Sequence, residues 1–307
     1  NSDGKFKTRQ IPAGHPEVYR LTLGKESLFF PIDSTETVTI TADTSAYSNG
    51  YKLAGSTSAE KMQQINDLIY KVVAGQGEQA VAYDPELKRA LAQLILSDPS
   101  GIVAYYTLFR RVGDTPLFNP EDRSDLKMIG AVANAFVSKR PNDPRTDYLS
   151  QLYLSSRRSN GLRAATDTIV ANEITLPEIS LLDRNGKERS LTEEAAKGKV
   201  MILNFTAYGA ENSPAINLEL AKIYDANKDA GIEIYQVSVD NDEFVWRQAA
   251  ANIPWIAVFN SPKHGATNLM KYNVTNLPAT FVINRRGELV ERVDNITQLS
   301  SAVARYL

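Results

Sequence analysis

The chain has 307 residues, of which 43% are hydrophobic and 23% charged, and its formal net charge is −2. This composition is typical of a globular protein with two or three domains, and no stretch approaches the roughly 18 uninterrupted apolar residues of a membrane span. The near-neutral net charge does not indicate nucleic-acid binding, because phosphate recognition needs clustered lysine and arginine.

Cysteine is absent from the sequence, and histidine occurs only at His15 and His264. The absence of cysteine excludes disulfides, thiolate catalysis, iron–sulfur clusters and thiolate zinc sites together. The two histidines lie far apart beside proline and glycine, so they support neither a metal site nor a Ser-His-Asp triad. We expect a surface or capping role for both, and we expect no metal and no cofactor.

The first residues, 1–56, alternate short β-branched and aromatic stretches with turn residues. Period-two alternation of this kind predicts a small antiparallel β unit. A unit of this size is too short to hold a core alone, so either a preceding strand is missing or the sheet packs on the next segment of the chain. The predicted strands cover residues 5–9, 17–23, 27–32 and 37–41.

Residues 57–165 have a helical pattern throughout. Ser58 is the predicted N-cap of the first helix, because apolar residues come after it at three-to-four spacing. Asp84 and Pro85 predict the start of a second helix, with aspartate as the cap and proline at the first helical position. Three further helices are expected over residues 102–112, 120–140 and 145–156.

Residues 166–307 alternate strands and helices, which indicates an α/β layered fold. The near-continuous apolar run at residues 200–205 is typical of a central strand buried on both faces. Turn residues predict hairpins around 183–186 and 285–287. The remaining predicted strands cover 232–239, 255–260, 279–284 and 289–293, and the predicted helices cover 214–228, 242–251, 265–272 and 297–306.

Three stretches of this region carry a family resemblance. They are the Asp-x-Asn-Gly-Lys turn at 183–187, the run at 198–205, and the Leu-Pro-Ala-Thr-Phe-Val-Ile-Asn stretch at 277–284. In this order and spacing they resemble the flanking hairpin, active-site strand and cis-proline segment of thioredoxin-like redoxin domains. The resemblance implies a thioredoxin-like domain over 166–307, with a central mixed sheet flanked by helices, from the thiol–disulfide oxidoreductases.

The redox motif of that family is rewritten in this chain. Where the family has Cys-x-x-Cys, the sequence has Ala210, Glu211, Asn212 and Ser213. Alanine cannot attack a disulfide, and a serine hydroxyl ionises too weakly to exchange with one. Both tryptophans of the family motif are also replaced, and Glu211 adds a negative charge where a thiolate needs the opposite. We therefore predict no catalytic residue.

Two features beside the lost motif have structural and functional interpretations. Ser213 followed by Pro214 predicts a helix cap, which we favour over a nucleophile because no histidine or lysine base is adjacent. In thioredoxin-like proteins the residue before the cis-proline can pair with an extended peptide by strand addition, and the resemblance implies the same possibility for Leu277 and Pro278; alternatively, the loop is retained because the fold needs it. The predicted binding residues are Tyr208, Ser213, Leu277 and Pro278.

The N-terminal segments also carry a resemblance. The order of the strands near Phe6, at 16–21 and at 33–40, followed by 52–60 leading into helices, resembles a domain of unknown function often fused to redoxin domains in bacterial lipoproteins. The resemblance implies a cell-envelope protein, facing the periplasm or tethered to the outer membrane. Because the sequence begins with Asn1, we interpret it as a processed form whose signal segment or lipid anchor is already removed.

Three functions remain open. The leading hypothesis is a non-catalytic accessory protein that binds a protein or extended peptide partner and no nucleic acid. The second is a component of a working thiol–disulfide or peroxide-reducing system whose cysteines are supplied elsewhere. The third is small-ligand binding by the helical segment, in a pocket lined by Tyr105, Tyr106 or Phe109, although these rings are also expected in a helix core.

Overall fold

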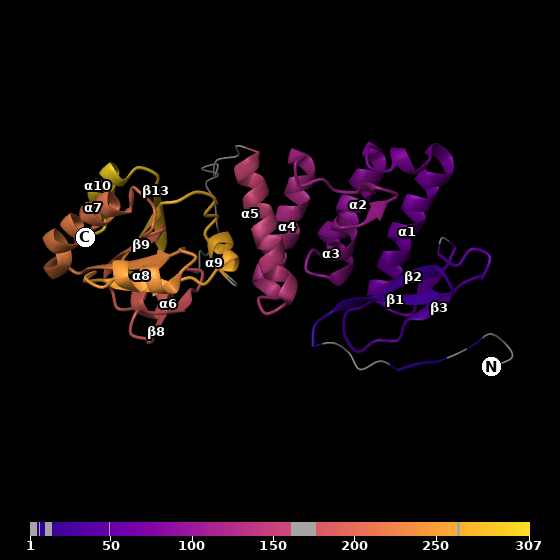
Figure 1. Ribbon diagram of the computed structural model, residues 1–307, viewed down its shortest axis with the longest axis horizontal. Helices are drawn as coiled ribbons and strands as arrows, with labels where there is room; N and C mark the ends of the chain where they lie inside the picture. The colour runs from indigo at the N-terminus through magenta and orange to yellow at the C-terminus, as the bar shows by residue number, and fades with distance from the viewer. Residues whose placement is uncertain (1–4, 6, 10–13, 49, 161–175, 263–264) are drawn as a thin grey trace. The chain divides into compact units, whose positions relative to one another are not determined.

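The computed structural model describes residues 5, 7–9, 14–48, 50–160, 176–262 and 265–307. The chain divides into two compact units, Asn1–Leu149 and Ser150–Leu307 (Figure 1). The division into domains at 1–56, 57–165 and 166–307 stays a prediction, and His264 lies outside the described residues. Within the described residues, none of the helices combines the length and apolar composition needed to cross a bilayer.

The N-terminal unit begins with two short antiparallel sheets and continues with helices (Figure 1). Strand β1 pairs with β2 along its full length, and β3 pairs with β4. The elements are β1 Glu17–Leu23, β2 Glu26–Ile32, β3 Thr39–Thr41, β4 Lys52–Ala54, α1 Thr57–Gln76, the 3-10 turn η1 Glu78–Ala80, α2 Pro85–Ser97, α3 Ile102–Leu108, β5 Arg111–Val112, β6 Thr115–Pro116 and α4 Arg123–Lys139. Helix α5 Pro144–Ser159 begins in this unit, and its residues from Ser150 onward belong to the C-terminal unit.

Several predicted boundaries of this unit need correction. Helix α1 is capped by Ser56, whose hydroxyl accepts from the Ala59 N–H at 3.1 Å, whereas the hydroxyl of Ser58 donates to Glu36. The predicted helix 102–112 ends at Leu108, because the chain turns into the β5–β6 hairpin. Residues 5 and 7–9 form no strand. The predicted cap at Asp84 is confirmed, since its carboxylate accepts from Leu87 N–H at 2.8 Å.

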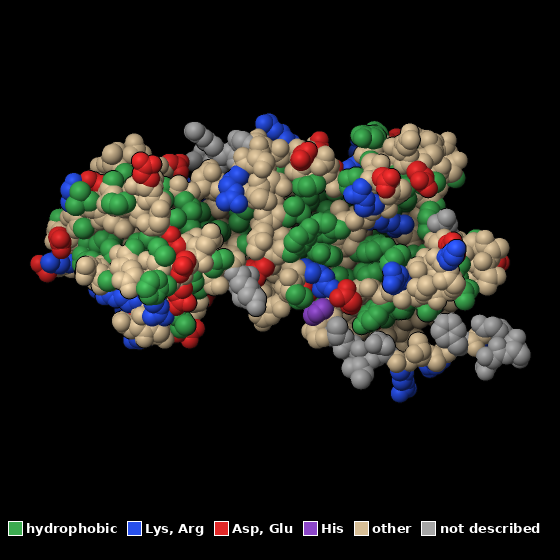
Figure 2. Space-filling model, viewed as in Figure 1, with side chains coloured by type: hydrophobic (Ala, Val, Ile, Leu, Met, Phe, Trp, Pro, Cys, Tyr) green, Lys and Arg blue, Asp and Glu red, His purple; other side chains and the backbone are tan. Residues whose placement is uncertain are grey.

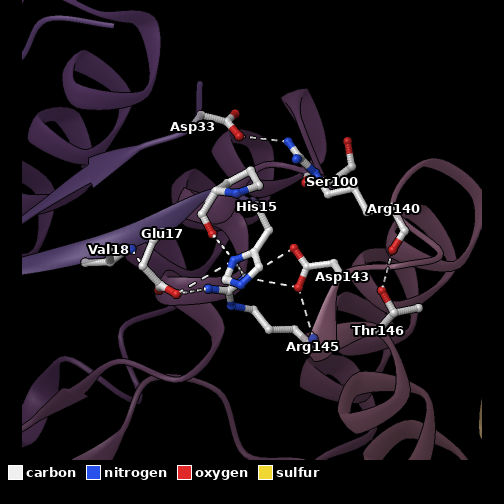
Figure 3. A network of polar contacts seen from close by, with 10 residues as sticks. His15, Glu17, Val18, Asp33, Ser100, Arg140, Asp143, Arg145 and Thr146 are labelled. Carbon is white, nitrogen blue, oxygen red and sulfur yellow. Dashed lines mark hydrogen bonds and ion pairs between the residues drawn. The ribbon is translucent and has the colours of Figure 1, made fainter. Parts of the chain in front are cut away.

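Two arginines connect the β region of this unit to its helices through hydrogen bonds to carboxylates (Figure 3). The guanidinium of Arg145 donates to Asp143 at 3.0 Å and to Glu17 on β1 at 2.5 Å, and Arg140 donates to Asp33 at 2.8 Å. The predicted surface residue His15 is half-buried at the edge of this network, 3.4 Å from Arg145. The small β unit is thus held by charge-assisted hydrogen bonds that join residues more than 100 positions apart.

We expect Arg145→Ala to destabilise the N-terminal unit by about 3 kcal/mol, because the buried carboxylate of Asp143 would lose its charged partner. Calorimetry of the whole chain measures the effect. The matched control is Arg286→Ala, which breaks an exposed ion pair and should change little. Equal effects of the two substitutions would contradict the role given to Arg145.

The aromatic residues of α3 pack on one another and on their neighbours. Tyr105 lies 4.8 Å from Phe109 and 6.1 Å from Phe136 between ring centroids, and Tyr106 lies 6.0 Å from Phe29. These contacts support the helix-core interpretation of the aromatic stretch. Burial raises the pKa of the Tyr106 hydroxyl to about 12.

This shift predicts a loss of stability at alkaline pH. An unfolded tyrosine ionises near pH 10, so the contribution of Tyr106 to the free energy of unfolding is complete below pH 10 and is lost as pH rises toward 12. We expect Tyr106→Phe to make the fall in unfolding free energy between about pH 10 and 12 shallower, as measured by denaturant titration with helix circular dichroism. The control is Tyr83→Phe at an exposed position; an unchanged slope in Tyr106→Phe would refute the assignment.

The C-terminal unit has a five-stranded mixed sheet flanked by helices, in the order β11-β10-β9-β12-β13 (Figure 1). Strands β9, β10 and β11 are parallel, and β12 runs antiparallel to both β9 and β13. The elements are β7 Ser180–Leu182, β8 Glu188–Ser190, α6 Leu191–Ala195, β9 Val200–Thr206, α7 Ser213–Asn227, η2 Lys228–Ala230, β10 Ile232–Ser238, α8 Glu243–Ala249, β11 Ile256–Phe259, α9 Ala266–Lys271, β12 Ala279–Ile283, β13 Leu289–Val293, η3 Ile296–Gln298 and α10 Leu299–Ala304. The predicted thioredoxin-like fold class is confirmed.

Strand β9 separates the two larger of three hydrophobic clusters in this unit. All seven of its residues are buried, as the apolar run predicted. Met201, Leu203 and Phe205 belong to one core, while Val200 and Ile202 belong to the other. Alternate side chains of a strand point to opposite faces, which is why β9 contributes to both clusters. It is the middle strand of the sheet, and its carboxyl end reaches the candidate site.

Candidate functional site

Three segments meet at the carboxyl end of β9. In the sheet register, Thr206 at the end of β9 pairs with Ser238 at the end of β10, and Phe205 pairs with Ala279 at the start of β12. The loop after β9, the segment after β10 and the Leu277–Pro278 turn before β12 therefore lie together. The Leu277–Pro278 peptide bond is cis, as the resemblance implied.

The rewritten motif forms an exposed loop that leads into α7. Gly209 through Asn212 are exposed, whereas Ser213 is buried, with 2% of its surface accessible. Ser213 does not cap the helix as predicted: α7 begins at Ser213, and Asn212 holds the cap position without a side-chain hydrogen bond. The reason is that two successive turns, closed by the N–H groups of Ala210 and Ser213, bring the chain into the helix already in helical conformation. A side-chain cap needs an extended backbone.

Asp240 holds this loop from the segment after β10. Its carboxylate accepts from the N–H groups of Tyr208 at 2.8 Å and Gly209 at 2.9 Å, and from the Ser238 hydroxyl at 2.7 Å. Hydrogen bonds to a carboxylate are stronger than those between neutral groups, so the loop has a defined position. Asp240 is not among the site residues predicted from the sequence, although its place two residues after the end of a buried parallel strand was a usable signal.

Beneath the loop, Gln236 is the centre of a buried polar network. Its side-chain oxygen accepts from the Tyr208 hydroxyl at 2.5 Å and from the Trp255 indole N–H at 2.9 Å. Gln236 is completely buried, and Tyr208 and Trp255 are 7% and 6% exposed. Burial, with a smaller effect from the charge of Asp240, raises the pKa of the Tyr208 hydroxyl far above its usual value. Tyr208 is therefore a neutral anchor for the loop.

The amide group of Gln236 extends the network to strand β9 and helix α7. Its amide N–H groups donate to Asn204 on β9 at 3.0 Å and to Asn217 on α7 at 2.8 Å. Asn204 in turn donates to the Thr280 hydroxyl on β12 at 2.9 Å. These groups are neutral amides and hydroxyls, so none of them can accept a proton from a thiol near neutral pH. The network can position the loop, but it cannot activate a nucleophile.

The predicted binding residues separate into two sets. Tyr208 and Ser213 are buried, so their side chains face the interior and not a partner. Leu277 and Pro278 are exposed, with 42% of the Leu277 surface accessible. Among the described residues, no group of three or more histidine, aspartate or glutamate side chains is arranged to hold a metal ion.

Exposed hydrophobic residues occur on the two helices that follow the motif loop and Asp240 in the chain. Leu218 on α7 is 58% exposed, and Phe244 and Val245 on α8 are 68% and 47% exposed. Hydrophobic side chains reach the surface of the C-terminal unit among charged ones in Figure 2. These residues are not among those predicted from the sequence, because an exposed apolar residue on a helix of an α/β fold resembles a core residue in the periodic pattern.

Comparison with known proteins matches residues 173–292 to the AhpC/TSA family. The chain is 30% identical over 142 residues to thiol-disulfide oxidoreductase ResA of Bacillus subtilis (strain 168), which covers 43% of this chain and 71% of ResA. It is 27% identical over 128 residues to nucleoredoxin of Mus musculus. That match covers 41% of this chain and only 29% of the nucleoredoxin.

One solved structure, an uncharacterized thioredoxin-like protein from Bacteroides vulgatus, is 39% identical, with a TM-score of 0.40 and coverage of 44% of this chain and 90% of that one. These matches concern the C-terminal part, and the resemblance of the N-terminal residues stays a prediction. The chain belongs to the thioredoxin-like thiol–disulfide oxidoreductase family, with an AhpC/TSA redoxin domain at residues 173–292 and no cysteine in its sequence.

Proposed function

We propose that this protein is a non-catalytic member of its family that binds an extended peptide segment of a protein partner beside Leu277 and Pro278. The observation that carries the proposal is the contrast at one edge of the sheet. The motif loop has no thiol and is fixed from below by Asp240 and Gln236, while the cis-proline turn beside it is exposed. A fixed scaffold with an open apolar turn favours binding without turnover.

The chemistry of the loop supports the absence of turnover. Thiol–disulfide exchange requires a thiolate, and the chain of 307 residues has no cysteine to supply one. The remaining hydroxyl at the motif, on Ser213, is buried. The buried network beneath the loop consists of amides and hydroxyls, and the carboxylate of Asp240 is occupied by the N–H groups of Tyr208 and Gly209 and by the Ser238 hydroxyl.

The cis-proline turn supports peptide binding. The hydrogen bonds of the described residues do not involve the backbone of Leu277, which leaves its N–H and C=O available to an extended chain. Main-chain pairing of this kind supplies affinity, and apolar contacts on either side supply specificity. The side chain of Leu277 offers such a contact. We further propose that the protein acts in the cell envelope, attached through an N-terminal lipid anchor.

The first test concerns turnover. In an insulin-reduction assay with dithiothreitol, we expect the rate with the protein to equal the rate of the blank without it. Turnover clearly above the blank would overturn the non-catalytic assignment. ResA, a family member named as a thiol-disulfide oxidoreductase, serves as the positive control.

The second test concerns binding. A fluorescein-labelled nine-residue peptide of alternating leucine and glutamine is titrated with the protein and followed by fluorescence anisotropy. We expect Leu277→Ser to weaken binding about tenfold, the effect of losing about 1.4 kcal/mol of apolar burial. Leu182→Ser, at a similarly exposed leucine on β7, is the matched control. Equal affinities of both variants would refute binding at the cis-proline turn.

A further inference from the structure

A cavity of about 350 Å³ lies at the amino ends of the parallel strands in the C-terminal unit. Among the residues that line it, Lys199 directly precedes β9, Glu233 is the second residue of β10, and Trp255 directly precedes β11. The turn of the β7–β8 hairpin forms another part of its wall. Parallel strands begin at the same edge of a sheet, whereas the motif loop follows the carboxyl end of β9. The cavity is therefore separate from the proposed peptide site.

Arg184, in the hairpin turn, is a cation of this wall that the protein holds without a carboxylate. Its Nη1 atom donates to the backbone carbonyls of Ala250, Ala251 and Ile253 at 2.6, 2.9 and 3.0 Å. These carbonyls follow the end of α8, where the helix dipole favours a positive charge. In the part of the chain that the structure describes, the Nε and Nη2 atoms of Arg184 have no hydrogen-bond partner. One edge of a fixed guanidinium thus remains available to a ligand.

The hairpin turn that carries Arg184 is itself held in position by Asp183. The buried carboxylate of Asp183 accepts from the backbone N–H groups of Asn185 at 2.9 Å and Lys187 at 3.0 Å. It also accepts from the Nε atom of Arg189 at 2.9 Å. Hydrogen bonds to a carboxylate are stronger than those between neutral groups, so the turn has a defined conformation. Arg184 is therefore preorganised, which lowers the entropic cost of binding a ligand.

The other charged side chains of the wall are paired with one another. Nitrogen–oxygen distances of 2.5–3.4 Å join Arg189 to Asp183 and Glu194, Lys197 to Glu194, and Lys199 to Glu233. The wall thus has three carboxylates, all of them paired, and Arg184 is the fourth and surplus cation. The charged residues that lie next to the wall in the chain or are hydrogen-bonded to it cancel, being Lys187, Arg247, Glu188 and Glu193.

We propose that this cavity binds a small anion, whose carboxylate or phosphate group accepts from the Nε and Nη2 atoms of Arg184. The planar guanidinium matches two oxygen atoms of such a group at once. The ammonium groups of Lys197 and Lys199 line the same cavity, and their side chains are 56% and 43% exposed, so they add attraction for the anion. The volume lies at the lower end of the roughly 300–1,000 Å³ of small-molecule pockets, which suits a small metabolite. This site does not depend on the proposed function.

Titration of the nitrogen-15-labelled whole chain with succinate, inorganic phosphate and the neutral analogue succinamide tests the proposal by NMR. The ionic strength is held at about 100 mM, so that distant surface charges are screened. We expect one of the two anions to shift the Nε–H signal of Arg184 and the backbone amides of Asn185 and Gly186 to saturation, and succinamide to shift none of them. Tighter binding of succinate assigns the site to carboxylates, and tighter binding of phosphate assigns it to phosphates. The absence of saturation by either anion, or equal binding of succinamide, would overturn the proposal.

Variants locate the bound anion. Arg184→Lys should weaken it about tenfold, because an ammonium group keeps the charge but cannot bind two oxygen atoms side by side. Lys199→Gln should weaken it about threefold through the loss of one nearby charge. The matched control is Lys222→Gln on α7, which also removes an exposed lysine paired with a glutamate and should leave the affinity unchanged.

The unfolding midpoint in denaturant, followed by tryptophan fluorescence, shows whether Arg184→Lys is folded. If this variant is not folded, Lys199→Gln decides, because its side chain lies at the surface. An affinity in Lys199→Gln equal to that in Lys222→Gln would then overturn the proposal. If Arg184→Lys is folded and binds the anion as tightly as the unmodified chain, the assignment to Arg184 is wrong.

Discussion

Replacing Gln236 by leucine is expected to lower the free energy of unfolding of the C-terminal unit by about 4 kcal/mol, although the two side chains have similar volumes. The substitution leaves the hydroxyl of Tyr208 and the indole N–H of Trp255 buried without an acceptor. Each unpaired buried polar group costs about 1–3 kcal/mol, and the hydrogen bonds lost by Tyr208 and Trp255 belong to one connected network.

Tryptophan fluorescence during denaturant unfolding measures this effect selectively. Both tryptophans of the chain, Trp246 and Trp255, lie in the C-terminal unit, so the N-terminal unit does not contribute. Gln248→Leu on α8, at an exposed position, is the matched control and should shift the midpoint little. A small shift in Gln236→Leu would show that the network is dispensable, and the loop would then not be fixed in the way we describe.

The sequence predicted the architecture of the C-terminal unit well because its signals are local and strong. The run at 200–205 is typical of a strand buried on both faces, and the hairpin turns carry glycine where a left-handed backbone is required, as at Gly186 and Gly287. The cis geometry at Pro278 came from the family resemblance. No rule of periodicity would have identified it.

The candidate site was predicted only in part, because its geometry depends on long-range contacts. Asp240 acts on residues about 30 positions earlier in the chain, and nothing in the local pattern around it reveals that partner. The prediction of a cap at Ser213 was wrong for a related reason, because two turns upstream determine the backbone conformation there. Exposure of Phe244 likewise depends on how α8 packs, not on its own spacing.

Returning cysteines to positions 210 and 213 is expected not to return turnover. In the variant Ala210→Cys with Ser213→Cys, the rate of insulin reduction should stay near the blank. The carboxylates of Glu211, Asp240 and Asp242 oppose ionisation of the first thiol, so its pKa should stay near or above about 8.5. The alkylation rate by iodoacetamide as a function of pH measures that value directly.

Neutralising two of these carboxylates tests this electrostatic argument. Adding Glu211→Gln and Asp242→Asn to the cysteine variant should lower the thiol pKa by about one unit and raise the alkylation rate at pH 7 severalfold. Asp225→Asn with Asp229→Asn, at two exposed positions near the end of α7 and in η2, is the matched control and should change neither the thiol pKa nor the alkylation rate. Efficient insulin reduction by the cysteine variant alone would show that the scaffold still supports redox chemistry and that only the thiols were lost.

The same geometry makes the cysteine variant a trap for a bound segment. Position 210 is exposed, so its thiol can attack the disulfide of a cysteine that is added to the leucine–glutamine peptide and activated as a mixed disulfide, which releases the activating thiol. Position 213 is buried over a neutral network, so the second thiol has no base and a raised pKa, and it resolves the mixed disulfide slowly. The adduct should therefore persist in mass spectra for hours in the double variant, as in Ala210→Cys alone. Rapid release by the double variant would mean that Ser213 occupies a working resolving position.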